Sequence, residues 1–267
     1  MSPFHERLIE RFLHNAKNDW PRLYDLSGEE LIERFDVYGG FIKNAAKNDI
    51  ALDDAVEILI EIVRVAEKKG YLNLFEELIS MTGDLNDRTP QQLVHLRNRA
   101  GQISRFRNEH KLALIMHRSA LDIAEQNDDQ FSIAESHFYL GESYYFQNDI
   151  VKAWEHTRYA ESFLKNELKE ATYLEASFWI LKGNIKIEHQ DYEEAIGFFE
   201  IAENIFMQLG SKIGVSRSLT NRGLAYFYQR KYDEALDLFT KAKSLLSDNN
   251  FEMAQILNTE SRVWIEI

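Results

Sequence analysis

The chain has 267 residues, a formal charge of -13 at pH 7, three Pro, twelve Gly and no Cys. The lack of Cys excludes disulfides, thiolate metal sites and a cysteine nucleophile, and the acidic balance is unlike the basic surface that nucleic-acid binding requires. No apolar run reaches the roughly 20 residues of a membrane span, and the first residues do not form a secretory signal. We therefore expect a cytoplasmic protein with neither nucleic acid nor membrane among its partners.

Residues 1–90 have a helical composition without a clear repeat, and they contain 11 basic and 18 acidic residues. Apolar residues at helix spacing predict a long helix over Leu31 to Ile42, with a capping-box start at Ser27. Two further stripes, Leu52 to Ala66 and Leu72 to Ile79, predict two more helices. We interpret this region as an N-terminal helical cap or degenerate repeats, because a repeat array must cover its apolar ends. A separate effector bundle is the alternative.

A repeat follows, marked by a glycine every 40 to 42 residues and by alanines twelve and nineteen residues after each glycine. The glycines are Gly101, Gly141, Gly183 and Gly223, and the alanines are Ala113, Ala153, Ala195, Ala235, Ala120, Ala160, Ala202 and Ala242. Small residues at fixed positions let two antiparallel helices approach closely, so this spacing predicts a stack of helical hairpins. Short polar turns such as Gln147 to Asp149 separate the two helices of a unit. A fifth unit begins near Phe251 and ends with its first helix.

The pattern within each unit resembles the tetratricopeptide repeat family across residues 91–267. The fourth unit carries the fullest set: Leu219, Gly223, Tyr226, Ala235, Phe239 and Ala242. At the position of Phe239 the second unit has Thr157 and the first has His117. The resemblance implies an all-α, right-handed superhelical solenoid of helix-turn-helix repeats with an N-terminal helical cap. It also implies that 91–267 is an array of four repeats plus a final half repeat.

In tetratricopeptide proteins the first helices of successive units line a groove, which the resemblance makes the candidate peptide-binding surface. The groove positions carried over from the family are Asn98, Arg99, Gln102, Arg105, Phe138, Glu142, Tyr145, Ile180, Asn184, Ile187, Arg217, Thr220, Asn221 and Leu224. Asn and Gln both donate to and accept from a peptide backbone, and Arg binds a carboxylate through two parallel bonds. We expect Asn98, Asn184 and Asn221 to contact a peptide backbone. A merely solvated polar face is the alternative for any one of these residues.

Catalytic and metal-binding motifs are absent from the sequence. It contains no P-loop, no G-x-G-x-x-G fingerprint and no G-x-S-x-G elbow. The eight His are scattered without a ligand spacing such as H-E-x-x-H, although His117 and His137 are expected on facing helices of neighbouring units. We therefore predict a protein that is not an enzyme and uses no metal and no cofactor.

Three functions are compatible with these features. The first is a non-catalytic scaffold or regulator that binds a peptide or protein segment in the groove. The second rests on Ala134 to Phe146 (AESHFYLGESYYF), which, with the long repeat and the helical N-terminal region, resembles peptide-sensing regulators of Gram-positive bacteria and their phages. Those include the Rap response-regulator phosphatases, and the resemblance implies action on a partner protein through the N-terminal helices. The third is a homo-oligomeric adaptor, a homodimer formed through the C-terminal helix around Trp264.

Overall fold

The computed structural model describes residues 3–18, 28–48, 50–51, 54–55, 58, 89–167, 172–246 and 251–267. Its helices are α1 (Pro3–Asn18), α3 (Gly28–Asn48), α6 (Pro90–Phe106), α7 (His110–Gln126), α8 (Gln130–Phe146), α9 (Ile150–Glu167), α10 (Tyr173–Glu188), α11 (Tyr192–Gln208), α12 (Lys212–Tyr228), α13 (Tyr232–Ser244) and α14 (Phe251–Glu266). These residues contain no strand, and the predicted all-α class is confirmed. The predicted helix over Leu72 to Ile79 and the cap at Ser27 fall outside the described ranges, and of the predicted helix over Leu52 to Ala66 the structure describes residues 54–55 and 58, which are helical.

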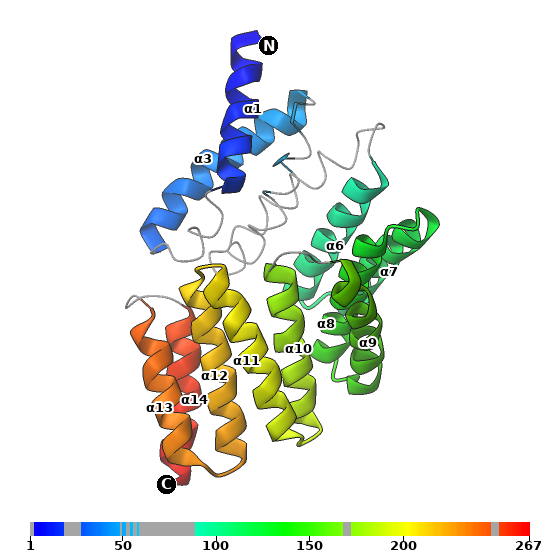
Figure 1. The fold of residues 1–267 in the computed structure, drawn as a ribbon. Coiled ribbons are helices and arrows are strands. Elements are labelled where there is room, and N and C mark those ends of the chain that lie inside the picture. The colour runs from blue at the N-terminus through cyan, green and yellow to red at the C-terminus, as the bar shows by residue number, and fades with distance from the viewer. Residues whose placement is uncertain are drawn as a thin grey trace.

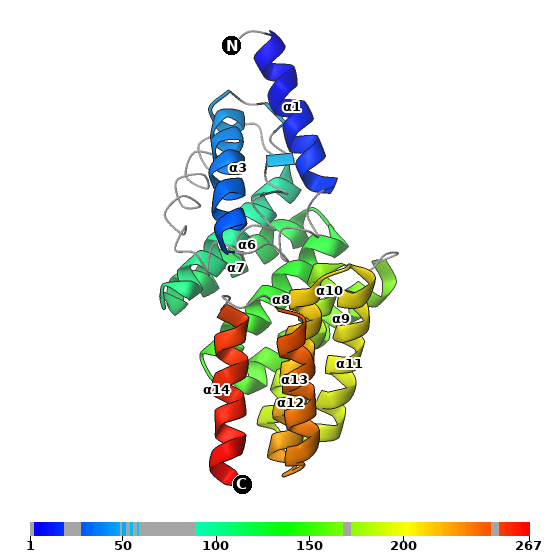
Figure 2. The same ribbon diagram turned by 90° about the vertical axis from the view of Figure 1, so that its left-hand side faces the viewer.

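The helices from α6 to α13 form antiparallel pairs that stand side by side, as Figure 1 shows. The pairs are α6 with α7, α8 with α9, α10 with α11 and α12 with α13, and α14 packs on α12 and α13 (Figure 2). This is the right-handed solenoid of helix-turn-helix repeats that the sequence predicts. No helix within the described ranges is long and apolar enough to cross a membrane. The outer face of α14 exposes Trp264 and Ile265, and the homodimer proposed for this helix stays a prediction.

A glycine on the first helix allows the two helices of a pair to touch. A Cβ added to Gly183 would lie only 2.3 Å from the ring of Phe199, so the ring packs directly on bare backbone. Both residues are buried. The same facing positions recur as Gly101 with His117, Gly141 with Thr157 and Gly223 with Phe239. The glycine spacing in the sequence is therefore the spacing of these contacts.

The turn inside each pair has one repeated backbone geometry. Its left-handed residue is Asn108, Asn148, Gln190 or Arg230, with φ between 61° and 63°. The next N–H donates to the carbonyl five residues earlier, as Asp191 does to Lys186 at 2.9 Å, which is the Schellman arrangement of a helix end. Because the turn is the same in each unit, every second helix folds back on the same side of its first helix.

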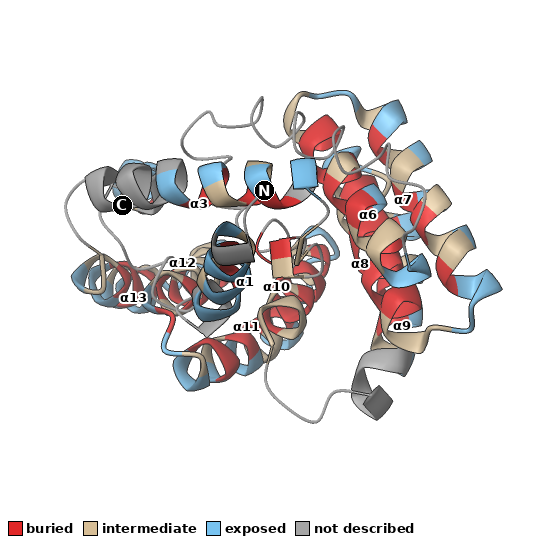
Figure 3. Cartoon of the chain, turned by 90° about the horizontal axis from the view of Figure 1, so that it is seen from above, coloured by how far each residue is buried: buried red, intermediate tan, exposed pale blue. Residues whose placement is uncertain are grey.

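The apolar core follows the lines along which the helices meet, where buried residues gather in Figure 3. One cluster runs without a break from α8 to α12 and includes Phe138, Phe178 and Phe199, each nearly or completely buried. Burying a side chain of this size contributes about 1.5–3 kcal/mol. The N-terminal helices α1 and α3 pack separately on each other through Phe12, whose ring stacks on Phe41 at a centroid distance of 3.7 Å.

We predict that Gly183→Ala lowers the free energy of unfolding by about 1–3 kcal/mol, because its methyl group overlaps the ring of Phe199 in a packed core. Gly197→Ala on α11 is the matched control, because nothing lies within 4 Å of its added Cβ. That change is expected to raise the free energy of unfolding by up to about 1 kcal/mol through helix propensity. Urea unfolding followed by circular dichroism measures both. Equal effects of the two variants would contradict the close contact.

Candidate functional site

A pocket of about 270 Å³ lies across the first helices of the array. Its described lining residues come from α6, α8, α10, α12 and α14: Gln102, Arg105, Phe106, Glu142, Tyr145, Phe146, Ser177, Ile180, Leu181, Asn184, Arg217, Asn221 and Gln255. None of these residues belongs to a second helix. The pocket is just below the usual size range of small-molecule sites, so it fits a few side chains of a ligand rather than a folded domain.

Eight of the fourteen predicted groove residues line this pocket: Gln102, Arg105, Glu142, Tyr145, Ile180, Asn184, Arg217 and Asn221. Three others, Asn98, Arg99 and Phe138, are buried away from it, and Ile187, Thr220 and Leu224 are half-buried outside its lining. The other five lining residues, Phe106, Phe146, Ser177, Leu181 and Gln255, are not among the fourteen predicted residues. Gln255 lies in the second turn of α14, 38 residues after Arg217, so the spacing of 40 to 42 residues between the repeat glycines does not locate it.

Asn98 and Arg99 are buried because they join the first repeat to the second. The amide of Asn98 donates to Glu135 Oε2 and to Ser136 Oγ, each at 3.2 Å. Nη2 of Arg99 lies 3.2 Å from Glu135 Oε1, and its Nη1 donates to Gln102 at 2.6 Å. In contrast to the prediction, both side chains are thus bound to neighbouring side chains and do not line the pocket.

Phe138 also differs from the prediction, and the reason is packing. Its side chain is completely buried in the apolar cluster between α8 and the neighbouring helices. A phenyl ring gains more from complete burial than from a partly wet groove wall. The aromatic surface of the pocket is supplied instead by Phe106 and Phe146 at the ends of α6 and α8.

Glu135 is the anionic centre of a buried network behind the pocket. Its Oε2 lies 2.8 Å from His95 Nδ1, and its other oxygen faces Arg99. Burial opposes the charge, but His95, Arg99 and the amide of Asn98 together lower the pKa of Glu135 to about 2. Burial also opposes the charge of His95, and the facing Glu135 outweighs it, so the pKa of His95 is raised. Gln102, held by Arg99, connects this network to the pocket.

Arg105 and Glu142 form the charged wall of the pocket. The guanidinium of Arg105 lies 4.3 Å from the ring centroids of both Phe106 and Phe146, and its Nη2 lies 3.3 Å from Glu142 Oε2. Nε of Arg105 and Oε2 of Glu142 are buried without a hydrogen-bond partner. The ion pair therefore leaves two buried polar atoms of the pocket wall without a hydrogen bond.

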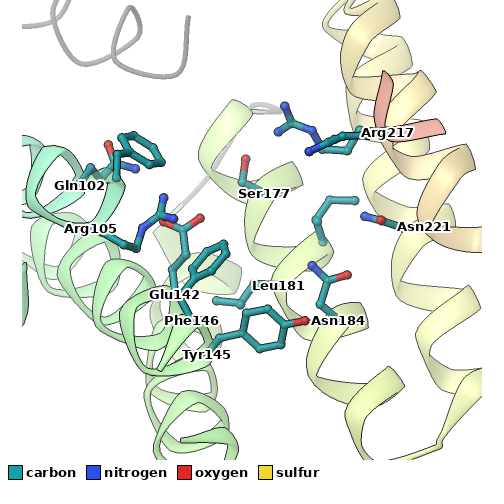
Figure 4. A pocket seen from close by; sticks show the side chains of 13 residues that line it. Gln102, Arg105, Glu142, Tyr145, Phe146, Ser177, Leu181, Asn184, Arg217 and Asn221 are labelled. Carbon is teal, nitrogen blue, oxygen red and sulfur yellow. The ribbon is translucent and has the colours of Figure 1, made fainter. Parts of the chain in front are cut away.

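The remaining polar groups of the pocket are mainly amides. Figure 4 shows Asn184 on α10 and Asn221 on α12 pointing into the pocket, with Arg217 above them. Burial and the nearby Glu188 raise the pKa of Tyr145 to about 12, so its hydroxyl stays neutral and can both donate and accept. The side-chain amides and the Tyr145 hydroxyl can each form hydrogen bonds with the N–H and C=O groups that alternate along a peptide backbone.

The histidines do not assemble a site of their own. His117 Nδ1 lies 3.3 Å from Asn98 Oδ1, and His137 Nδ1 lies 2.9 Å from His156 Nδ1, so His137 meets α9 rather than His117. Burial lowers the pKa of His117 to about 3 and that of His137 to about 4. Among the described residues no three His, Asp or Glu are grouped so that they could hold a metal ion.

We predict that the protein loses stability as the pH falls from 6.5 toward 3, partly through His117. Burial and the charges of Arg105 and Arg99 keep its folded-state pKa near 3, whereas the unfolded value is 6.5, so the unfolded chain binds the proton first. The free energy of unfolding then falls by about 1.4 kcal/mol per pH unit for this group. His117→Phe, which copies the ring of the third and fourth repeats, should remove that slope.

Urea unfolding between pH 4 and 6.5 measures the slope in both proteins. His189→Phe is the matched control, because His189 is exposed at the end of α10 and has no buried ring to desolvate. An unchanged slope in His117→Phe would show that His117 carries a proton in the folded protein.

Comparison with known proteins supports the repeat architecture. Residues 174–248 match the family model of the tetratricopeptide repeat. Regulatory protein RapG of Bacillus subtilis (strain 168) is 24% identical over 142 residues, which are 53% of this chain and 39% of that protein. The chain therefore matches well under half the length of this curated relative.

Two solved structures cover nearly the whole chain. The structure of a Rap protein complexed with Competence and Sporulation Factor matches this chain with a TM-score of 0.65 at 15% identity. The match covers 98% of this chain and 72% of the Rap chain. The structure of NprR in complex with its cognate peptide NprX matches with a TM-score of 0.55 at 16% identity. That match covers 97% of this chain and 73% of the NprR chain. At these identities the likeness shows the fold. Residues 174–248 match the tetratricopeptide repeat, and the described part of the chain is a solenoid whose fold resembles those of the Rap and NprR structures.

Proposed function

We propose that the protein is a non-catalytic regulator that binds an extended peptide across its first helices. The observation that carries this proposal is the pocket itself, which is built from α6, α8, α10, α12 and α14 and is lined by four side-chain amides. A peptide lying across several first helices meets one polar position after another. The Rap and NprR structures with similar folds hold a factor and a cognate peptide, which supports the same kind of ligand here.

Asn184 and Asn221 are the residues we assign to the peptide backbone. They come from neighbouring first helices, α10 and α12, and both lie in the pocket wall. Each amide can accept from a peptide N–H and donate to a peptide C=O, and a net hydrogen bond of this kind contributes about 0.5–1.5 kcal/mol. Ile180 and Leu181 supply apolar surface between them for a ligand side chain.

We predict that Asn184→Ala and Asn221→Ala each weaken peptide binding by about 2- to 10-fold, because each removes backbone hydrogen bonds. Peptides are first selected from a library of synthetic linear hexapeptides on the purified full chain, and their dissociation constants are then measured by fluorescence anisotropy. Asn204→Ala is the matched control, since Asn204 is exposed on the second helix α11. Unchanged binding by both pocket variants, or an equal loss in the control, would contradict the proposal.

A second proposal is that the N-terminal helices contact a partner protein whose binding depends on the peptide. An apolar cavity of about 480 Å³ lies between α1 and α3, and its walls include Leu8 and Val37, which are 47% and 50% exposed. Large apolar side chains exposed together are typical of a protein interface.

We predict that Leu8→Lys and Val37→Lys abolish the binding of such a partner in pull-down experiments and leave peptide affinity unchanged. Both changes place a charge on the apolar surface and lie far in the sequence from the pocket. Glu10→Gln, on an exposed position of α1, is the charge-matched control, because it also shifts the net charge by one positive unit, and it should retain the partner. Retention of the partner by all three variants would exclude this surface as its binding site.

A further inference from the structure

A charged pair recurs where one repeat packs on the next. One member follows the alanine that lies nineteen residues after a repeat glycine, and the other directly precedes the next repeat glycine. Between the second and third repeats these residues are Glu161 and Lys182, and their Oε2 and Nζ atoms lie 2.8 Å apart. Between the third and fourth repeats they are Glu203 and Arg222, with 2.6 Å between Oε2 and Nη1. At both junctions an acid on the second helix thus binds a base on the following first helix.

The last junction carries the same pair with the charges exchanged. The equivalent residue of α13 is Lys243, and its Nζ lies 2.8 Å from each carboxylate oxygen of Glu260 on α14. Glu260 lies 38 residues after Arg222, which is also the distance in sequence from Arg217 to Gln255, and these two residues both line the pocket. The helix α14 therefore continues the register of α12, but the base is now on the second helix and the acid on the first.

The first junction is apolar at the same two positions. They hold Leu121 on α7 and Leu140 on α8. Leu140 is buried in the apolar cluster, and Leu121 packs against that cluster. The four junctions thus have three chemistries: apolar with apolar, acid with base, and base with acid. A first helix packed on the wrong second helix would bury a charge against leucine or bring two like charges together, and both arrangements cost free energy.

The two junctions of equal sign differ in the surroundings of the base. Lys182 is 4% exposed, and its ammonium lies 4.3 Å from the ring centroid of Phe198. Arg222 instead binds a second acid, Glu200, at 2.8 Å. Glu200 lies three residues before the acid of its pair, and the residue of α9 at that position is Arg158. On α9 a helix carrying Arg222 would therefore meet a like charge.

We propose that these pairs position the first helices in their order along the pocket, and that the exchanged charges of Lys243 and Glu260 specify the docking of α14. Opposite charges hold the correct neighbours together, and like charges exclude the wrong ones. The side chains of Lys243 and Glu260 are 28% and 14% exposed, so salt screens this pair less than a fully exposed one. Because α14 contributes Gln255 to the pocket lining, both are positioning residues for that wall, whatever ligand the pocket binds.

Hydrogen–deuterium exchange of the full chain tests the proposal at the last junction. Glu260→Lys places two ammonium groups together and Lys243→Glu places two carboxylates together, so each should speed amide exchange in α14 about tenfold. Glu260→Gln removes the attraction without adding repulsion and should speed exchange only about threefold. The double variant Lys243→Glu with Glu260→Lys restores opposite charges and should exchange within about twofold of the wild-type rate.

Two references make this measurement specific. Amide exchange in α6 and α8 of the same molecules reports on the rest of the array, because the terminal helix of a repeat array can open without the others. Lys241→Glu is the matched control. It makes the same charge change on α13, at a side chain that is 60% exposed and pairs with Asp237 of its own helix. This control should leave exchange in α14 unchanged.

The double variant gives the decisive result. If it exchanges as fast as the single variants, the proposal is overturned, because matching the charges would then not matter. Equal effects of Glu260→Lys and Glu260→Gln would also overturn it, since like charges would then not be excluded. Equally faster exchange in α6 and α8, or in α14 of Lys241→Glu, would contradict it as well, because the effect would then not be specific to the docking of α14.

Discussion

The contact of a buried side chain with a bare glycine backbone is the constraint on which the rest of the structure depends. In the third repeat Gly183 meets Phe199 at a distance that leaves no room for a methyl group. The contact fixes how closely the two helices of a pair approach, and the repeated Schellman turn fixes the side to which the second helix returns. Four repetitions of these two features place all first helices along one face.

That face brings together residues that are far apart in the sequence. Gln102 of α6 and Gln255 of α14 line one pocket although about 150 residues separate them. The polar residues of the pocket lie outside the apolar cluster, which runs along the lines where helices meet and includes Phe178 and Phe199, whereas Ile180 and Leu181 belong to both. Changes at the polar positions of the pocket therefore need not disturb the stack.

The buried network around Glu135 shows where local sequence reasoning reaches its limit. The repeat spacing was enough to predict the helical pairs and the position of the turns, and the resemblance to tetratricopeptide repeats predicted the face that carries the pocket. Neither was enough to predict that Asn98 and Arg99 are bound by a carboxylate one repeat later. Helix periodicity predicts the helix face on which a polar side chain lies, but the packing of the neighbouring repeat determines whether that face is exposed to solvent. For the same reason His137 meets His156 rather than His117.

The central claim is that a peptide lies across the first helices, and hydrogen–deuterium exchange of the full chain with and without a selected peptide tests it most directly. The account predicts slower exchange in the peptide-bound protein for the amides of α10 and α12 around Asn184 and Asn221, with little change in the second helices α11 and α13. Slower exchange confined to α11 and α13, or to α1 and α3, would contradict it, because the ligand would then bind a different face of the solenoid.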